Sequence, residues 1–226
     1  MRGWEKVLVV AAHPDDEVLG MGGTISRMTT EGIIVDLLIV TDGSSSQYED
    51  FEEKRQIKFN ETIKSNEILG FNEFIHWNYP DMRLAGVDIL QLQNDFQVLI
   101  NRGKYDTVFS QSKYDINKDH QVIYEALSVV LRPHPESHVK TYLTYYVNSS
   151  TEWGTHFNKE RFQATLFIDI SEHIDAKLLA LGCYETELRA YPHPRSLKAV
   201  KNSAEYFGNI VGLGFAEPFE VIHDIW

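Results

Sequence analysis

The sequence is poor in cysteine and has no long apolar segment, and both absences narrow the kinds of protein it can encode. A single cysteine, Cys183, among 226 residues excludes a framework of internal disulfides and suits a reducing compartment. No apolar run approaches the roughly 20 residues that a membrane-spanning helix needs. The first ten residues do not follow the pattern of a secretory signal peptide. We therefore expect a cytoplasmic protein that does not associate with membranes.

Positive charge is also scarce. The 21 lysines and arginines are outnumbered by 33 acidic residues, which gives a formal net charge of −12. A surface of this sign repels phosphate backbones, so nucleic acid is not an expected partner, whereas a small anionic ligand in a locally positive pocket is still compatible. The chain has no internal repeat or low-complexity tract, and its length suits one α/β domain over residues 1–226.

Short apolar segments alternate with longer amphipathic ones along the chain. The apolar segments predict strands at residues 6–13, 33–43, 73–79, 106–112, 140–147 and 163–171. The amphipathic segments predict helices at residues 18–32, 48–71, 86–104, 170–188, about 196–208 and within 115–133. This alternation is typical of an α/β fold with a doubly wound, mostly parallel, Rossmann-like sheet and helices on both faces. Ligands of such sheets bind beyond the carboxyl ends of the strands, so functional residues are expected there.

Three of the predicted strands end in polar clusters. These clusters are HPDDE at residues 13–17, TDG at 41–43 and DINKDH at 115–120. Imidazole and carboxylate groups are the usual ligands of a catalytic Zn²⁺. His13 and Asp16 are three residues apart, so a tight turn can aim both side chains at one point. The sequence therefore predicts a metal site that begins in the first cluster.

Residues from the same clusters can supply the rest of such a site. His120, at a neighbouring strand end, can complete the ligand set, and Asp15 can accept the proton of the attacking water, as a hydrolytic zinc site requires. The simpler alternative is that acids after a strand only cap the next helix. We prefer that alternative for Glu17. For Asp42, a capping role and a role in supporting the ligands are equally consistent with the sequence.

The stretch AHPDDEVLGMGGT at residues 12–24 resembles the opening motif of the PIG-L/LmbE-like deacetylases, A-H-P-D-D-E followed by a glycine-rich helix start. The resemblance continues, in the family's order, with YPDMRL, DINKDHQ, FIDIS, YETELRAYPHPRS and GLGFAEPFEVI. Family members are metal-dependent hydrolases that remove an acyl group, typically acetyl, from an amino sugar or a related glycoconjugate. The resemblance implies a zinc-dependent deacetylase of a small N-acetyl amino sugar or glycoside, with Fe²⁺ as an alternative metal.

The resemblance also assigns roles to individual residues. It implies that His13, Asp16 and His120 bind the metal and that Asp15 is the general base. Asp119 directly precedes His120, as in the family's usual D-H pair, and is suited to orient a histidine.

One departure from the family concerns proton transfer to the leaving group. Several members carry a histidine three residues before the second metal histidine, where this chain has Asn117. An asparagine amide can donate a hydrogen bond to an oxyanion but cannot act as a general acid. Our candidate for the missing acid is His193, in the segment AYPHPRS. The alternative for His193 is an ordinary histidine in a surface loop.

A second departure concerns the cation that reaches the substrate. Many members have an arginine in the long second helix where this chain has Lys58, and Arg55 lies one turn earlier. A lysine cannot reproduce the arginine fork, and the preferred interpretation is that both are solvated helix charges. Asp81, in YPDMRL, matches a family position and is expected to line the site. Glu152 and Trp153 follow a strand and are candidates for a sugar pocket, although Trp153 also suits an ordinary rim position.

Two other functions are consistent with parts of the pattern. Dinucleotide-binding oxidoreductases share the predicted architecture, but the glycines at positions 20, 22 and 23 match neither common phosphate-binding motif, and close helix–strand packing explains them better. A non-catalytic metal- or sugar-binding relative is suggested by Asn117 and opposed by the presence of Asp15. The sequence is compatible with a homo-oligomer.

Overall fold

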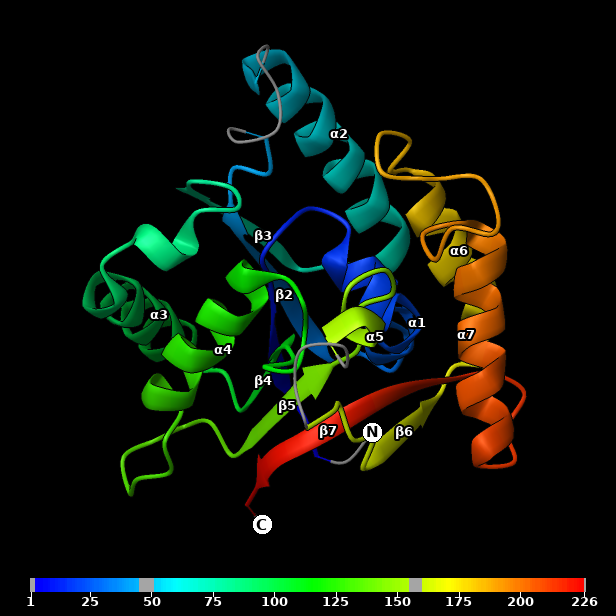
Figure 1. Cartoon of the computed structure of the whole chain (residues 1–226). Coiled ribbons are helices and arrows are strands. Elements are labelled where there is room, and N and C mark those ends of the chain that lie inside the picture. The colour runs from blue at the N-terminus through cyan, green and yellow to red at the C-terminus, as the bar shows by residue number, and fades with distance from the viewer. Residues whose placement is uncertain (1–2, 45–50, 155–159, 226) are drawn as a thin grey trace.

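The computed structural model describes residues 3–44, 51–154 and 160–225, and a seven-stranded sheet lies at its centre (Figure 1). The strands are β1 (Lys6–Ala11), β2 (Ile34–Thr41), β3 (Glu73–Tyr79), β4 (Thr107–Gln111), β5 (Thr141–Tyr145), β6 (Leu166–Asp169) and β7 (Ala216–Asp224). Their order across the sheet is β3-β2-β1-β4-β5-β7-β6. The first five strands pair in parallel, whereas β7 runs antiparallel to both β5 and β6.

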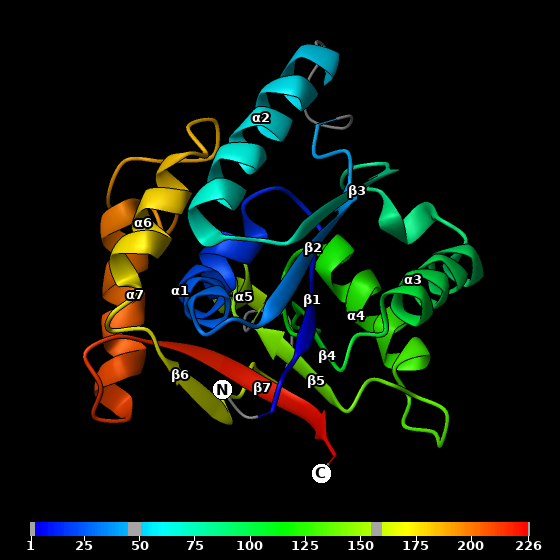
Figure 2. The same cartoon turned by 180° about the vertical axis from the view of Figure 1, so that it is seen from behind.

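Helices cover both faces of this sheet (Figures 1 and 2). They are α1 (Asp16–Thr30), α2 (Phe51–Leu69), α3 (Ile89–Gly103), α4 (Lys118–Val130), α5 (Thr151–Gly154), α6 (Ile174–Gly182) and α7 (Leu197–Ile210), with a 3-10 turn η1 (Leu84–Gly86). The prediction of an α/β fold with a mostly parallel sheet is therefore confirmed. Residues 48–50, where the second predicted helix was expected to begin, lie outside the described residues. None of the described helices is long and apolar enough to cross a membrane.

Strand β1 shows why the central strands are continuously apolar. Its alternate residues Val7 and Val9 pack into the core under α1, α2, α6 and α7, while Leu8 and Val10 pack into the core under α3 and α4. All four side chains are fully buried. Burying each one stabilises the fold by about 1.5–3 kcal/mol, so the strand is held firmly from both faces. The polar residues that follow β1 consequently start from a well-fixed position.

Helix α1 packs unusually closely on the sheet. A Cβ atom added at Gly20 would lie 2.3 Å from the ring of Tyr145 in β5, so only glycine fits there. The helix is kinked at Met21, where φ is −145°, and the backbone N–H of Gly23 beyond the kink donates to the buried carboxylate of Glu217 in β7. These contacts fix the position of α1 on the sheet, and the polar cluster after β1 leads into this helix.

Candidate active site

A cavity of about 400 Å³ lies beyond the carboxyl ends of β1, β4 and β5. The predicted site residues that line it are His13, Asp15, Asp16, Lys58, Asp81, Asn117, His120, Trp153 and His193. The predicted site residues that are not on its wall are Glu17, Asp42, Arg55, Asp119 and Glu152. Segments from distant parts of the chain therefore meet at the place where doubly wound sheets bind their ligands.

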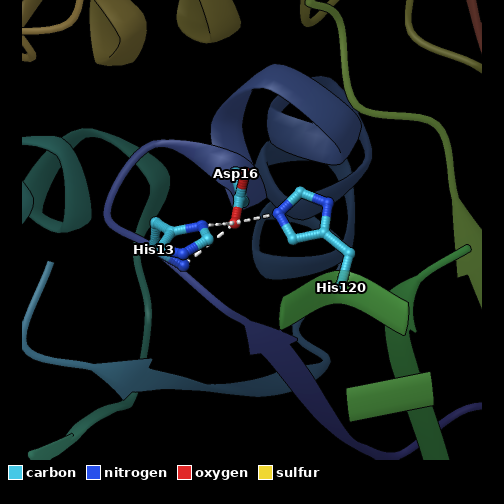
Figure 3. Close-up of side chains that lie close together, drawn as sticks. All are labelled: His13, Asp16 and His120. Carbon is cyan, nitrogen blue, oxygen red and sulfur yellow. Dashed lines mark hydrogen bonds and ion pairs between the residues drawn. The ribbon is translucent and has the colours of Figure 1, made fainter. Parts of the chain in front are cut away.

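The side chains of His13, Asp16 and His120 converge on one point in this cavity (Figure 3). His13 Nδ1 lies 3.3 Å and His120 Nε2 lies 3.1 Å from the same oxygen, Asp16 Oδ2. One ligand atom from each residue falls within 4.8 Å of the other two. Neither ring nitrogen of His120 has a hydrogen bond with good geometry among the described residues, although both are buried. Two imidazoles and one carboxylate with this geometry fit the donor set of a Zn²⁺ site.

A carboxylate lies at the other nitrogen of each histidine. His120 Nδ1 is 3.1 Å from Asp115 Oδ2, and His13 Nε2 is 3.2 Å from Asp119 Oδ2. Carboxylates in this position fix the ring orientation and the tautomer of a metal-binding histidine. His13 therefore presents Nδ1 to the site, and His120 presents Nε2. Asp119 contacts His13, which is distant in sequence, and not its neighbour His120.

Asp115 is a site residue that the sequence reasoning did not single out. Its buried carboxylate accepts hydrogen bonds from the Ser150 hydroxyl, from Thr151 Oγ1 at 2.8 Å and from the backbone N–H of Asn117 at 2.7 Å. These donors come from the end of the loop after β5, from the start of α5 and from the residue that caps α4. The available signal was the position of Asp115 as the first acid of the DINKDH cluster, but its partners Ser150 and Thr151, which follow β5, are identified only by the fold.

The electrostatic environment of the cluster favours a positive charge. Burial alone would raise the pKa of Asp16, but the adjacent His120 and His13 outweigh it and hold that pKa well below its usual range. Burial alone would lower the pKa of His13, but hydrogen bonds to Asp119 and Asp16 raise it to about 9. The pKa of His120 is likewise raised, because Asp16 and Asp115 outweigh its desolvation. A divalent cation would satisfy the same carboxylates.

Asp15 lies beside this cluster in an uncommon backbone conformation. Its φ of 104° is in the left-handed region, which residues other than glycine rarely adopt. Its Oδ2 atom is buried and accepts no hydrogen bond from the described residues. Burial raises the pKa of Asp15 well above its usual range, and the Arg195 guanidinium, with Nη1 3.7 Å from Oδ2, opposes this shift. The carboxylate is therefore available to a group that enters the cavity.

Glu17 supports the backbone of Asp15 from within the protein. The fully buried Glu17 carboxylate accepts a hydrogen bond from the Asp15 N–H at 3.2 Å and another from the Tyr184 hydroxyl at 2.5 Å. A carboxylate that accepts the backbone N–H of the residue before a helix caps that helix, and capping is the role that we preferred for Glu17. Burial raises the pKa of Glu17 to about 7. Tyr184 was not identified from the sequence. Its hydroxyl holds the Glu17 carboxylate, which in turn holds the backbone of Asp15.

The raised pKa of Glu17 predicts a pH-dependent stability difference. At pH values between 4.5, the usual pKa of a glutamate, and about 7, Glu17 is protonated in the folded state but ionised in the unfolded state. The stability that this group contributes therefore falls as the pH rises through this range. Glu17→Gln does not titrate, and its amide can accept the Asp15 N–H through its oxygen while its NH2 group donates to the Tyr184 hydroxyl. From pH 5 to pH 8, we expect the free energy of unfolding of the metal-free variant to gain about 2 kcal/mol relative to the metal-free parent in urea titrations. A difference in the free energy of unfolding that stays constant from pH 5 to pH 8 would contradict the raised pKa of Glu17.

Lys58 is buried, with only 4% of its surface exposed, and is not the solvated helix charge that the sequence led us to expect. Its Nζ donates to the carbonyl of Gly43 at 2.7 Å and lies 2.8 Å from a carboxylate oxygen of Glu187. The other Glu187 oxygen lies 2.6 Å from Arg195 Nη1. A chain of charges therefore runs from Lys58 through Glu187 and Arg195 to Asp15. Glu187 and Arg195 belong to the YETELRAYPHPRS segment, but the sequence reasoning assigned neither a role.

His193 and Asn117 lie on the wall of the cavity with defined hydrogen bonds. His193 Nδ1 accepts the backbone N–H of Arg195 at 3.1 Å, so the neutral ring carries its proton on Nε2. Asn117 caps helix α4, because its side-chain oxygen accepts the N–H of Asp119 at 2.9 Å. The amide nitrogen of Asn117 lies 3.6 Å from the sulfur of Met82, which also lines the cavity.

The remaining predicted substrate residues are distributed more widely. Trp153 is 39% exposed on the cavity wall, and Asp81 Oδ1 lies within the cavity 3.3 Å from His13 Nε2. Arg55 hydrogen bonds to Asn78 in β3 and does not line the cavity. Glu152 accepts hydrogen bonds from the backbone N–H groups of residues 149 and 150, where it holds the loop after β5.

Comparison with known proteins identifies relatives of this chain. The family model described as PIG-L, GlcNAc-PI de-N-acetylase, matches residues 8–131. An uncharacterized deacetylase, YaiS, of Escherichia coli K12 is 29% identical over 139 residues, 58% of this chain and 70% of that protein. The diacetylchitobiose deacetylase of Thermococcus kodakarensis is 24% identical over 245 aligned positions, 98% of this chain and 85% of that protein. Among solved structures, the conserved protein TT1542 from Thermus thermophilus has a TM-score of 0.78 at 26% identity, covering 97% of this chain and 96% of that one.

Proposed function

Because this chain belongs to the PIG-L, GlcNAc-PI de-N-acetylase family, we propose that it is a zinc-dependent hydrolase that removes an N-acetyl group from a small amino-sugar compound. The observation that carries the proposal is the position of Asp15. Its buried carboxylate, with an oxygen that no described residue hydrogen bonds, lies next to a cluster with the donor set of a Zn²⁺ site. A metal site with an adjacent carboxylate that is not a ligand is an arrangement that supports amide hydrolysis by an activated water molecule.

We assign the metal to His13 Nδ1, Asp16 and His120 Nε2, with Asp119 and Asp115 orienting the two rings. Zn²⁺ bound there would polarise the amide carbonyl and lower the pKa of a water molecule. Fe²⁺ also accepts imidazole and carboxylate ligands and is the alternative metal.

The protein's own residues account for the proton transfers. Asp15 accepts a proton as the water oxygen bonds to the carbonyl carbon. The C–N bond then breaks, and the leaving nitrogen takes either the proton that Asp15 gained from the water or the Nε2 proton of a protonated His193 ring, which leaves that ring neutral. We assign hydrogen-bond donation to the oxyanion to the Asn117 amide, since Asn117 lines the cavity, and buried Lys58 lines the same cavity as a second cation candidate. Acetate and a free amino sugar leave.

The cavity supports a small sugar substrate. Its volume of about 400 Å³ suits one or two sugar rings. The exposed face of Trp153 offers an apolar surface of the kind that packs against a pyranose ring. The relative from Thermococcus is described as a diacetylchitobiose deacetylase, which makes short N-acetylated sugars the first compounds to test.

The test is release of acetate by the metal-loaded protein from N-acetylglucosamine, N,N'-diacetylchitobiose and N-acetylglucosaminyl glycosides. We expect acetate and a primary amine in equal amounts from at least one compound, and loss of this activity after chelation of the metal. Binding of these compounds with no acetate released would instead favour a non-catalytic sugar-binding protein.

A further inference from the structure

Strand β3 forms one edge of the sheet, and among the described residues it pairs only with β2 (Figure 2). Alternate residues of a strand direct their N–H and C=O groups to opposite sides, so part of the β3 backbone faces away from β2. The strand has seven residues, EFIHWNY, with no proline or lysine and one charge at its first position. Proteins usually protect edge strands by shortness, lysine, proline or a covering element. At the opposite edge, β6 has only four residues, whereas β3 has none of the sequence protections.

Both faces of β3 are bordered by hollows. A hollow of about 630 Å³ lies between β3 and α3 and is lined by Trp77, Val98 and Arg102 among others. A second hollow, of about 340 Å³, lies between β3 and α2 and is lined by Phe59 and His76 among others. A strand added to a sheet edge sends alternate side chains to the two faces. An added strand at β3 would therefore find space for its side chains on each face.

Helix α3, beside the larger hollow, shows which occupant fits. Val98 is 68% exposed, more than any other large apolar side chain among the described residues. Asp95 and Arg102 lie on either side of it and line the same hollow, seven residues or about two helical turns apart. If two copies of α3 lie antiparallel with Val98 near the axis, Asp95 of each copy meets Arg102 of the other. The surface is thus complementary in charge to itself, as a two-fold interface requires.

We propose that β3 pairs antiparallel with β3 of a second copy of this chain, so that the sheet continues across a two-fold axis with the α3 helices side by side. The backbone of the free edge supplies the hydrogen bonds between the copies. The apolar contact at Val98 and the two Asp95–Arg102 pairs fix the register. Each copy carries a net charge of −12, and physiological salt limits the resulting repulsion to a range of about 8 Å.

Sedimentation equilibrium of the full chain tests this interface. In 0.15 M salt we expect the 26.0 kDa chain to sediment at about twice that mass. Val98→Lys places two lysines near the axis and should raise the dimer dissociation constant at least about tenfold. The matched control is Leu179→Lys, a 65% exposed side chain on α6, which lies on the other side of the molecule (Figure 1) and should leave the dimer intact. A wild-type chain that is monomeric at about 100 µM, or a Val98→Lys dimer of unchanged affinity, would overturn the proposal.

Hydrogen exchange locates the interface independently of any variant. Those backbone amides of residues 73–79 that face away from β2 should become at least about tenfold better protected when the wild-type protein is concentrated from mostly monomer to mostly dimer, whereas residues 166–169 of β6 should not change. A dimer whose protection appears elsewhere would show that another surface mediates association and would overturn the role of β3.

Discussion

Asp15→Asn should lower kcat by about 100- to 10,000-fold, the usual contribution of a general base, while the protein still binds one equivalent of metal. The amide has nearly the shape of the carboxylate but cannot accept the proton of the attacking water. The three proposed ligands do not include Asp15, so they should continue to hold the metal. The measurements are steady-state acetate release and metal content by atomic absorption.

Asp42→Asn is the matched control for this change. Asp42 also follows a strand at the carboxyl edge of the sheet, but it does not line the cavity, and one of its oxygens accepts the N–H of Ser44 at 3.1 Å. We expect a kcat close to that of the parent. Full metal content with a near-normal rate in Asp15→Asn would disprove the assignment of the base.

His120→Ala should lose both the metal and the activity, because it removes one of three ligands and leaves the buried carboxylates of Asp16 and Asp115 facing each other without the imidazole between them. Removing one partner from a buried charged cluster typically costs about 3–5 kcal/mol, so the variant should also unfold at a lower urea concentration. Metal affinity by competition with a chromogenic chelator and kcat on the same preparation give the two readouts.

His193→Ala separates metal binding from proton transfer in the same cavity. His193 lines the cavity but is not one of the clustered metal ligands. Its loss should therefore leave metal affinity nearly unchanged and lower kcat by about 100-fold, the lower end of general acid catalysis. An unchanged kcat would remove His193 from the mechanism. Loss of metal comparable to that in His120→Ala would mean that His193 is a metal ligand and not the general acid.

Two features were not predicted correctly from the sequence, because each depends on contacts with segments that are distant in the chain. Strand β7 was not predicted, and Pro218 lies within it, paired with Phe167 of the edge strand β6. A proline within an apolar run argues against a strand unless the strand lies beside an edge or a bulge, and that position is known only once the sheet is assembled. Lys58 was misjudged for a similar reason, since its burial depends on Gly43 and Glu187, which lie on other segments.

The sequence by itself determined the α/β sheet and the grouping of polar residues after its strands. These depend on local pattern, because apolar segments of strand length alternate with amphipathic ones, and a tight turn after β1 brings His13 and Asp16 together. The tertiary structure alone decided which groups support the site. His13 and Asp119 are 106 positions apart, and Glu17 and Tyr184 are 167 apart. Such contacts arise only when helices and strands pack, because hydrogen bonds and ion pairs at 2.5–3.3 Å require a spatial precision that residue spacing does not encode.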